Sequence, residues 1–127
     1  MIIGIGTDII RVERIARLLI QYPGFCHRVF TASEIEYCNG KGNRTQSFAV
    51  RFAAKEAVMK ALGTGWDGRI NWTDIEIGKD AKGRPCVIAY NATREMLASL
   101  GVDRIHISLS HERDYALAFV VLERENS

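Results

Sequence analysis

Hydrophobic and polar residues recur along the chain with the periods of both helices and strands, which predicts a mixed architecture. In the segment 11–22, apolar residues recur at i, i+3, i+7 and i+10 and form one stripe, which is typical of an amphipathic helix. The predicted elements are, in chain order, a strand at 2–8, a helix at 11–22, a short helix at 31–38, a long helix at 46–62, strands at 74–79 and 85–90, a helix that Asn91 caps and that runs to about residue 100, and strands at 104–110 and 115–122.

The long helix at 46–62 is the strongest feature of this pattern. It is rich in alanine and other good helix formers, and Gly63 follows it as a stop signal. Phe52, Ala57 and Ala61 are among the residues that leave it little polar surface, which argues against a fully exposed face. The chain has no repeat, linker or low-complexity tract. Residues 1–127 are therefore expected to form a single α+β domain with a mostly antiparallel sheet.

The charge of the chain is nearly balanced overall but uneven locally. Its 127 residues carry a formal net charge of +2, which is too small to indicate nucleic-acid binding by itself. Between residues 11 and 28, however, the only acid among several arginines is Glu13. Such a patch is either a docking surface for an anionic partner or an ordinary solvated helix face. The longest apolar runs are far short of the ~20 residues that span a bilayer, so no membrane span is expected.

Cysteine usage favours a reducing compartment. Cys26, Cys38 and Cys86 are odd in number and form no CxxC pair, which indicates reduced thiols and not a disulfide framework or a zinc site. The apolar N-terminal residues lack a basic region and are interrupted by Asp8, so they do not have the pattern of a signal peptide. We therefore expect a cytoplasmic protein.

Asp8 is a candidate functional residue because a carboxylate beside a buried strand is costly to desolvate and usually has a partner. One interpretation makes Asp8 the N-cap of the helix that follows, and the other gives it a role in a site. Glu56 and Lys60 lie four residues apart and share one face of the long helix. They form either a plain surface ion pair or part of the same site.

Asp8 and Glu56 together are suited to one Mg²⁺ ion, which typically takes one or two carboxylates and fills its octahedron with waters and substrate phosphates. Lys60 would add a positive charge for a phosphate oxygen. Two acids and a lysine without an obvious nucleophile suggest phosphoryl-type transfer, in which the protein positions groups and neutralises charge. Gly4 and Gly6 do not begin a dinucleotide-binding fingerprint, because the third glycine of that motif is missing.

Three segments of the chain resemble the holo-acyl-carrier-protein synthases, which are short 4′-phosphopantetheinyl transferases. They are 4–11 (GIGTDIIR), 51–65 (RFAAKEAVMKALGTG) and 107–118 (ISLSHERDYALA). These resemble, in order, the N-terminal motif of the family, its second motif around W/F-(A/S)-x-K-E-(A/S)-x-x-K, and its closing hairpin. The similarity spans essentially the whole chain, and it implies a homotrimer with its sites between subunits.

The resemblance also implies a reaction. A serine hydroxyl of an apo-acyl carrier protein attacks the β-phosphate of coenzyme A, phosphopantetheine is transferred, and adenosine 3′,5′-bisphosphate leaves. Asp8, Glu56 and Lys60 would be the catalytic residues, with Asp8 and Glu56 as ligands of Mg²⁺ and Lys60 on a phosphate. The general base would be Glu56 or a metal-held water. Ile10 stands where longer, pseudo-duplicated transferases carry a second acid, so a water should replace that ligand.

The resemblance implies contacts with coenzyme A outside this trio. Arg44 and Arg51 would hold its 3′-phosphate or its pyrophosphate. Ser110 and His111 would approach from the hairpin turn of the neighbouring subunit, although His111 could equally be a plain turn residue.

Arg14, Phe25 and Arg28 match positions that dock the acidic helix of the carrier protein, which would give the basic patch its partner. The resemblance does not fix whether that carrier serves fatty acid or polyketide synthesis. A rival class, a non-catalytic coenzyme A or nucleotide-binding module, explains the basic groups but not two acids placed for a metal. A small RNA-binding protein is disfavoured by the weak net charge and by the lack of an aromatic stacking platform on the expected strands.

Overall fold

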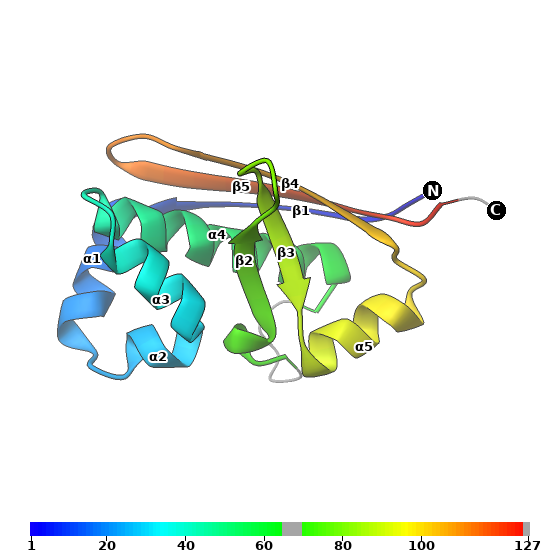
Figure 1. Ribbon diagram of the computed structural model, residues 1–127, viewed down its shortest axis with the longest axis horizontal. Coiled ribbons are helices and arrows are strands. Elements are labelled where there is room, and N and C mark those ends of the chain that lie inside the picture. The colour runs from blue at the N-terminus through cyan, green and yellow to red at the C-terminus, as the bar shows by residue number, and fades with distance from the viewer. Residues whose placement is uncertain (65–69, 126–127) are drawn as a thin grey trace.

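The computed structural model describes residues 1–64 and 70–125, which form a long helix against a three-stranded antiparallel sheet with smaller elements around them (Figure 1). The strand order of this sheet is β1-β5-β4, and the long helix α4 crosses one of its faces. Its elements are β1 (Ile2–Arg11), α4 (Arg44–Leu62), β4 (Arg104–His111) and β5 (Tyr115–Glu123). The smaller elements are α1 (Val12–Gln21), α2 (Phe25–Val29), α3 (Ala32–Asn39), the 3-10 turn η1 (Trp72–Asp74), the antiparallel hairpin of β2 (Ile75–Lys79) and β3 (Pro85–Ala89), and α5 (Asn91–Ser99).

The core lies between the large sheet and α4. Alternation along β5 directs Ala116, Ala118, Val120 and Leu122 toward the helix, and all four are fully buried. Most of α4 is buried as well, in keeping with its low polarity. Small alanines on both surfaces let the helix lie close to the strands. This packing against the strands therefore fixes the position of α4 relative to the sheet.

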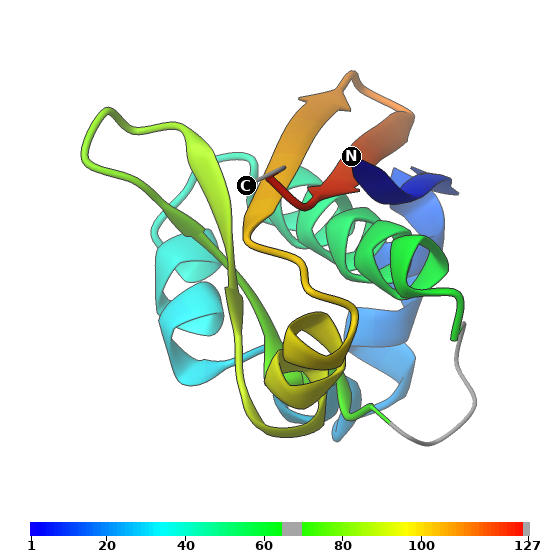
Figure 2. The same ribbon diagram turned by 90° about the vertical axis from the view of Figure 1, so that its right-hand side faces the viewer.

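The opposite side of the large sheet is apolar and uncovered. Ile5 and Ile9 of β1 are 55% and 63% exposed, and Leu117 and Phe119 of β5 are 43% and 45% exposed. Among the described elements, none lies over this side of the sheet in Figure 1 or in the perpendicular view of Figure 2. We call these four residues the open face. A continuous exposed apolar surface of this kind marks an interaction site.

A buried ion pair ties α4 to the smaller elements. The ammonium of Lys55 lies 2.7 Å from Glu34 of α3, and both side chains are fully buried. Lys55 also donates to the carbonyl oxygens of Trp72 and Ile75, at 3.1 and 2.5 Å. The other carboxylate oxygen of Glu34 accepts from the backbone N–H of Ile77 at 2.8 Å. The three protons of the ammonium therefore all have acceptors, and the pair joins α3, α4 and β2.

The predicted elements are confirmed in type, but several boundaries were wrong. β1 continues to Arg11, because its backbone pairs with β5 up to Tyr115. As a result α1 begins only at Val12 with Arg11 at its N-cap, which excludes the interpretation of Asp8 as a helix cap. α4 begins two residues before the predicted 46. The motif that ends at Gly65 extends by that residue outside the described part of the chain.

Two features of the smaller elements were not foreseen. The helix α2 has five residues, too few to produce a periodic signal in the sequence. Asn91 was expected to cap the following helix, but Tyr90 is the N-cap and Asn91 has a left-handed backbone with φ of 51°. Its side chain donates to Asp74 at 3.0 Å. Within the described residues, no helix is both long and apolar enough to cross a membrane.

Candidate active site

The first part of the site depends on a backbone contact between β1 and α4. A Cβ atom at Gly6 would lie 1.9 Å from the carbonyl oxygen of Ala57, and one at Gly4 would lie 2.0 Å from that of Ala61. Only glycine fits at these positions, because no side chain can be placed between the strand and the helix. Asp8 is the next residue of β1 that faces α4, so this close approach brings its carboxylate to the helix.

Asp8 meets Lys60 of α4 at this point. The Lys60 ammonium lies 3.0 Å from Oδ1 of Asp8 and donates to the carbonyl oxygen of Thr7 at 3.1 Å. The Asp8 side chain is 13% exposed and that of Lys60 is 51% exposed, so the carboxylate is largely enclosed while the ammonium reaches solvent. Lys60 therefore pairs with Asp8, and the plain pairing with Glu56 along the helix is replaced by a contact between β1 and α4.

Glu56 is half-buried beside this pair. Burial raises the pKa of Glu56 above its ordinary value and the charge of Asp8 raises it further, whereas the charges of Arg14 and Lys60 lower it. Two carboxylates that repel each other, one of them poorly hydrated, form a place where a divalent cation would relieve unfavourable electrostatics. Asp8, Glu56 and Lys60, which were predicted as catalytic residues, thus lie together.

The donor set fits a magnesium ion better than a closed metal centre. Among residues 1–64 and 70–125, no group of three or more His, Cys, Asp or Glu side chains is placed to hold a metal. Two carboxylates are the number that Mg²⁺ typically takes when substrate phosphates and waters supply its other ligands. Ile10 is 4% exposed and apolar, so it adds no ligand.

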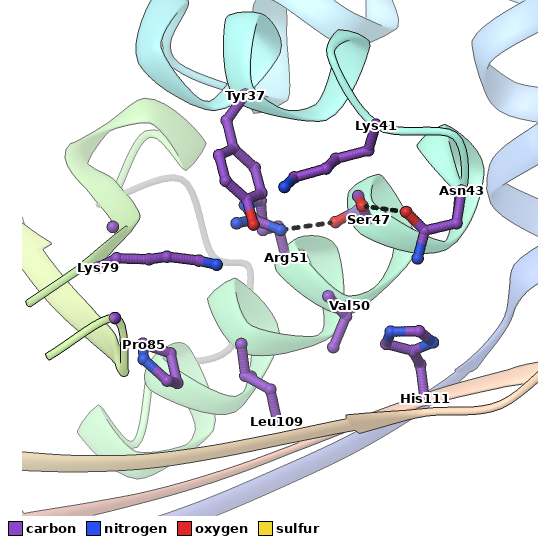
Figure 3. A pocket seen from close by; sticks show the side chains of 12 residues that line it. Tyr37, Lys41, Asn43, Ser47, Val50, Arg51, Lys79, Pro85, Leu109 and His111 are labelled. Carbon is purple, nitrogen blue, oxygen red and sulfur yellow. Dashed lines mark hydrogen bonds between the residues drawn. The ribbon is translucent and has the colours of Figure 1, made fainter.

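A second group lies in a hollow of about 350 Å³ bounded by α3, α4, the β2–β3 hairpin and the end of β4 (Figure 3). Two predicted residues, Arg51 and His111, line it. No acidic residue is among the described residues that line the hollow. The lining residues are Tyr37, Lys41, Asn43, Ser47, Val50, Arg51, Gly78, Lys79, Gly83, Pro85, Leu109 and His111. The hollow is therefore suited to an anionic ligand.

Three cations of the hollow surround one aromatic ring. The Arg51 guanidinium lies 4.3 Å from the centroid of the Tyr37 ring, and the ammonium groups of Lys41 and Lys79 lie 4.7 and 4.8 Å from it. Sequence reasoning missed Tyr37, Lys41 and Lys79, because they come from α3, the following loop and β2. No local spacing connects them; a glycine-rich polar loop with a lysine just before the second motif was the nearest signal.

Arg51 is held rigidly but incompletely bonded. It is 6% exposed, and its Nη1 atom donates to the carbonyl oxygen of Ser47 at 3.2 Å. Its Nε atom is buried without a hydrogen-bond partner. A buried donor without an acceptor costs about 1–3 kcal/mol, so a ligand that supplied an acceptor would gain affinity from it.

Two of the residues predicted to contact coenzyme A, Arg44 and Ser110, do not line this hollow. The Arg44 guanidinium donates to Asn39 at 2.6 Å and lies 5.0 Å from the ring centroid of Phe48. Ser110 and His111 are the last residues of β4 and not part of the turn that was expected. Ser110 pairs with Leu117 on the side of the open face, whereas His111 lines the hollow. The contacts of Arg44 and Ser110 with coenzyme A stay predictions.

The two groups lie on opposite flanks of α4. Asp8 pairs with Ala118, and Ala118 pairs in turn with Leu109 of β4, so these three residues share the inner face of the sheet. The helix covers Ala118 between them. In Figure 2, which looks along the sheet, β1 and the β2–β3 hairpin lie on either side of α4. One chain therefore does not bring the Asp8 group and the hollow into a single site.

The residues predicted to dock a carrier are only partly gathered. The Arg14 guanidinium lies 6.0 Å from the ring centroid of Phe52, and the Phe25 ring centroid lies 6.1 Å from it. Arg14 also acts on the pKa of Glu56, so it lies near the Asp8 group. Arg28 is exposed on α2. A basic surface with an aromatic centre thus adjoins the acidic pair.

Comparison with known proteins shows that the chain belongs to the 4′-phosphopantetheinyl transferase superfamily, whose model matches residues 4–120. The acidic pair with its lysine, the cationic hollow and the α+β architecture agree with this family. The holo-[acyl-carrier-protein] synthase of Koribacter versatilis is 44% identical over 124 residues, which are 97% of this chain and 99% of that protein.

Solved structures agree in fold. The holo-[acyl-carrier-protein] synthase of Neisseria meningitidis has a TM-score of 0.89 and 42% sequence identity, with 98% of this chain and 100% of that chain covered. A holo-(acyl-carrier-protein) synthase from Bacillus anthracis, in complex with CoA (3′,5′-ADP), has a TM-score of 0.81 and 39% identity, with 98% and 99% covered. The predicted resemblance is confirmed.

Proposed function

We propose that this chain is a holo-acyl-carrier-protein synthase in which residues 1–127 act as one transferase domain. It would transfer 4′-phosphopantetheine from coenzyme A to a serine of an apo-acyl carrier protein and release adenosine 3′,5′-bisphosphate. The observation that carries this proposal is the acidic pair of Asp8 and Glu56 with Lys60 beside it, in a chain of this family. A non-catalytic coenzyme A-binding module would have no use for that pair.

Asp8 and Glu56 would hold Mg²⁺ together with waters and a pyrophosphate oxygen of coenzyme A. When bound, the ion would supply positive charge for the pyrophosphate. Lys60 is the exposed partner of Asp8, so its ammonium could turn to a phosphate oxygen while the bound cation would neutralise the largely enclosed Asp8 carboxylate. The role of this flank is therefore to neutralise charge and to fix the phosphorus atom for attack.

The bond changes follow from the substrate. The serine oxygen forms a bond with the β-phosphorus, the bond from that phosphorus to the bridging oxygen breaks, and the adenosine bisphosphate keeps the bridging electron pair. The serine proton would pass to Glu56 or to a water held beside the acidic pair as the new bond forms. Lys60 then faces the negative charge that grows on the leaving phosphate.

The hollow would bind the 3′-phosphate of coenzyme A. The pyrophosphate is assigned to the Asp8 flank, so the 3′-phosphate is the remaining anionic group of the ligand. Three cations without an acid, and the unpartnered Nε atom of Arg51, support this assignment.

A homotrimer would assemble through the open face. The exposed apolar residues of β1 and β5 support burial against another copy. The position of the two groups on opposite flanks of α4 supports a site completed between chains, with the Asp8 flank of one protomer and the hollow of the next. The number three comes from the family resemblance.

The acyl carrier protein would dock on α1 and α2 next to the acidic pair. Arg14 and Arg28 supply positive charge for an acidic helix, and Phe25 supplies an apolar contact. Free thiols at Cys26, Cys38 and Cys86 support a cytoplasmic enzyme.

The test is mass spectrometry of an apo-acyl carrier protein after incubation with coenzyme A, Mg²⁺ and this protein. We expect a gain of one phosphopantetheine that EDTA prevents. D8A and E56A should each lose roughly 100-fold or more in rate, because a charge-stabilising ligand is removed, while E95A, an exposed acid of α5, should keep normal activity. Binding of coenzyme A without transfer would instead identify a binding module.

A further inference from the structure

Tyr37 has surroundings that an ordinary packing residue does not need. Its half-buried ring extends from α3 into the hollow, and three cationic side chains from three different elements approach it (Figure 3). Each of the three distances to the ring centroid is below 5 Å, within the range of cation–π attraction. One aromatic ring therefore contacts every lysine and arginine that lines the hollow.

Three cations in one hollow repel one another when no anion is bound. The electron-rich faces of the Tyr37 ring offset part of that repulsion, since they attract positive charge without neutralising it. A carboxylate in the same place would pair with the cations and compete with a phosphate. An aromatic ring gathers the charges and leaves them available for a ligand.

The hydroxyl of Tyr37 points into the hollow, toward the cationic side chains (Figure 3). Lys79 beside the hydroxyl lowers the pKa of Tyr37, burial opposes this shift, and the charges of Lys41 and Arg51 lower the pKa further. Ammonium and guanidinium groups can only donate, so none of these three cations can accept the phenolic proton, which stays available for an acceptor in the hollow. A phenol polarised by a cation is also a better donor than an ordinary one.

We propose that Tyr37 is a specificity-determining residue for the nucleotide end of the substrate: its ring assembles Lys41, Arg51 and Lys79, and its hydroxyl donates a hydrogen bond to an oxygen of a phosphate monoester in the hollow. The inference rests on the proposed function in that it takes the 3′-phosphate of coenzyme A as the monoester. It assigns the discrimination between ligands with and without that phosphate to a residue of α3.

The experiment measures binding by calorimetry, with adenosine 3′,5′-bisphosphate and AMP as probes that differ only in the 3′-phosphate. The ratio of their dissociation constants is compared for the wild-type protein, Y37F and Y37L. Y37F keeps the ring and removes the hydroxyl, so the ratio should fall about tenfold, the loss typical of one hydrogen bond to a charged group. Y37L also removes the ring, and the ratio should fall further, while AMP binding stays nearly unchanged.

Y90F is the matched control, because it also removes a phenolic hydroxyl. The Tyr90 hydroxyl donates to Glu76 at 3.2 Å, and neither residue lines the hollow. Its ratio should equal that of the wild-type protein. Steady-state kinetics give a second readout: Y37F should raise the KM for coenzyme A and leave the KM for 3′-dephospho-coenzyme A and for the carrier unchanged. Thermal melts of each variant show whether it is folded, and Y37F carries the test if Y37L is not.

The possible results distinguish a wrong role for Tyr37 from a wrong assignment of the hollow to the 3′-phosphate. If the wild-type protein discriminates and Y37F and Y37L do so equally well, Tyr37 has no such role although the hollow is correctly assigned. If the wild-type protein binds both probes equally, the hollow does not receive the 3′-phosphate and both assignments are wrong. If Y37F weakens both probes alike, Tyr37 acts on the fold and not on the phosphate, which overturns the proposal.

Discussion

Replacing Lys55 by methionine should destabilise the protein more than any other single lysine substitution that keeps the length of the side chain. Its ammonium is fully buried and bonds to Glu34 and to two carbonyl oxygens. In K55M the Glu34 carboxylate would remain buried without its counter-ion, and the free energy of unfolding should fall by about 3–5 kcal/mol. The exposed Lys82 makes no side-chain contact of this kind, so K82M should stay within about 0.5 kcal/mol of the wild-type value.

Urea unfolding measures these changes in the free energy of unfolding. All variants are compared at one protomer concentration, because an assembly that dissociates on unfolding gains stability with concentration. The double variant K55M/E34Q separates charge from packing. The double variant no longer buries an unpaired carboxylate, so its loss in free energy of unfolding should be smaller than the sum of the two single losses by at least about 1 kcal/mol. A K55M loss below about 1 kcal/mol, or strict additivity in the cycle, would refute the reasoning that a charged pair is buried there.

Three further outcomes are expected. Since the folded-state pKa of Glu56 is raised, the metal-free protein should lose stability as pH rises from the unfolded pKa of Glu56 to its folded pKa. The gain in Tm on adding Mg²⁺ should shrink as pH falls through the folded pKa of Glu56 and vanish in E56Q. R28E should raise the KM for the carrier and weaken its salt dependence, with R94E on α5 unaffected; equal losses for coenzyme A would contradict docking. F119E should abolish the proposed trimer in light scattering, and a trimer that persists in this variant would exclude the open face as its interface.

The sequence was sufficient where local pattern decides structure. The low polarity of α4 could be read from its alanines. The grouping of Asp8, Glu56 and Lys60 was implied by the resemblance of segments 4–11 and 51–65 to two motifs of one family. Boundaries were less accessible, because they depend on partners: β1 reaches Arg11 only because β5 offers Tyr115 for pairing. The short α2 lies below the length at which periodicity can be seen.

The hollow shows the larger limit of sequence reasoning. Tyr37, Lys41 and Lys79 converge from three elements, and only the packing of α3 and the β2–β3 hairpin against α4 brings them together. Arg44 illustrates the reverse case. The family resemblance implied a contact of Arg44 with coenzyme A, which stays a prediction, and the hydrogen bond of 2.6 Å to Asn39 five residues earlier was not foreseen. The spacing of residues in the sequence predicts neither long-range contacts nor the hydrogen bonds that a side chain makes with its neighbours.

The position of α4 between two half-sites makes the protein suited to subunit complementation. If each active centre combines the Asp8 flank of one protomer with the hollow of the next, a D8A chain and a K41A/K79A chain are each inactive alone. Every trimer that contains both kinds of chain nevertheless has one active centre in which both halves are intact. Random mixing of equal amounts should then restore about one quarter of wild-type activity. Two defective copies of the gene could thus support each other in one cell.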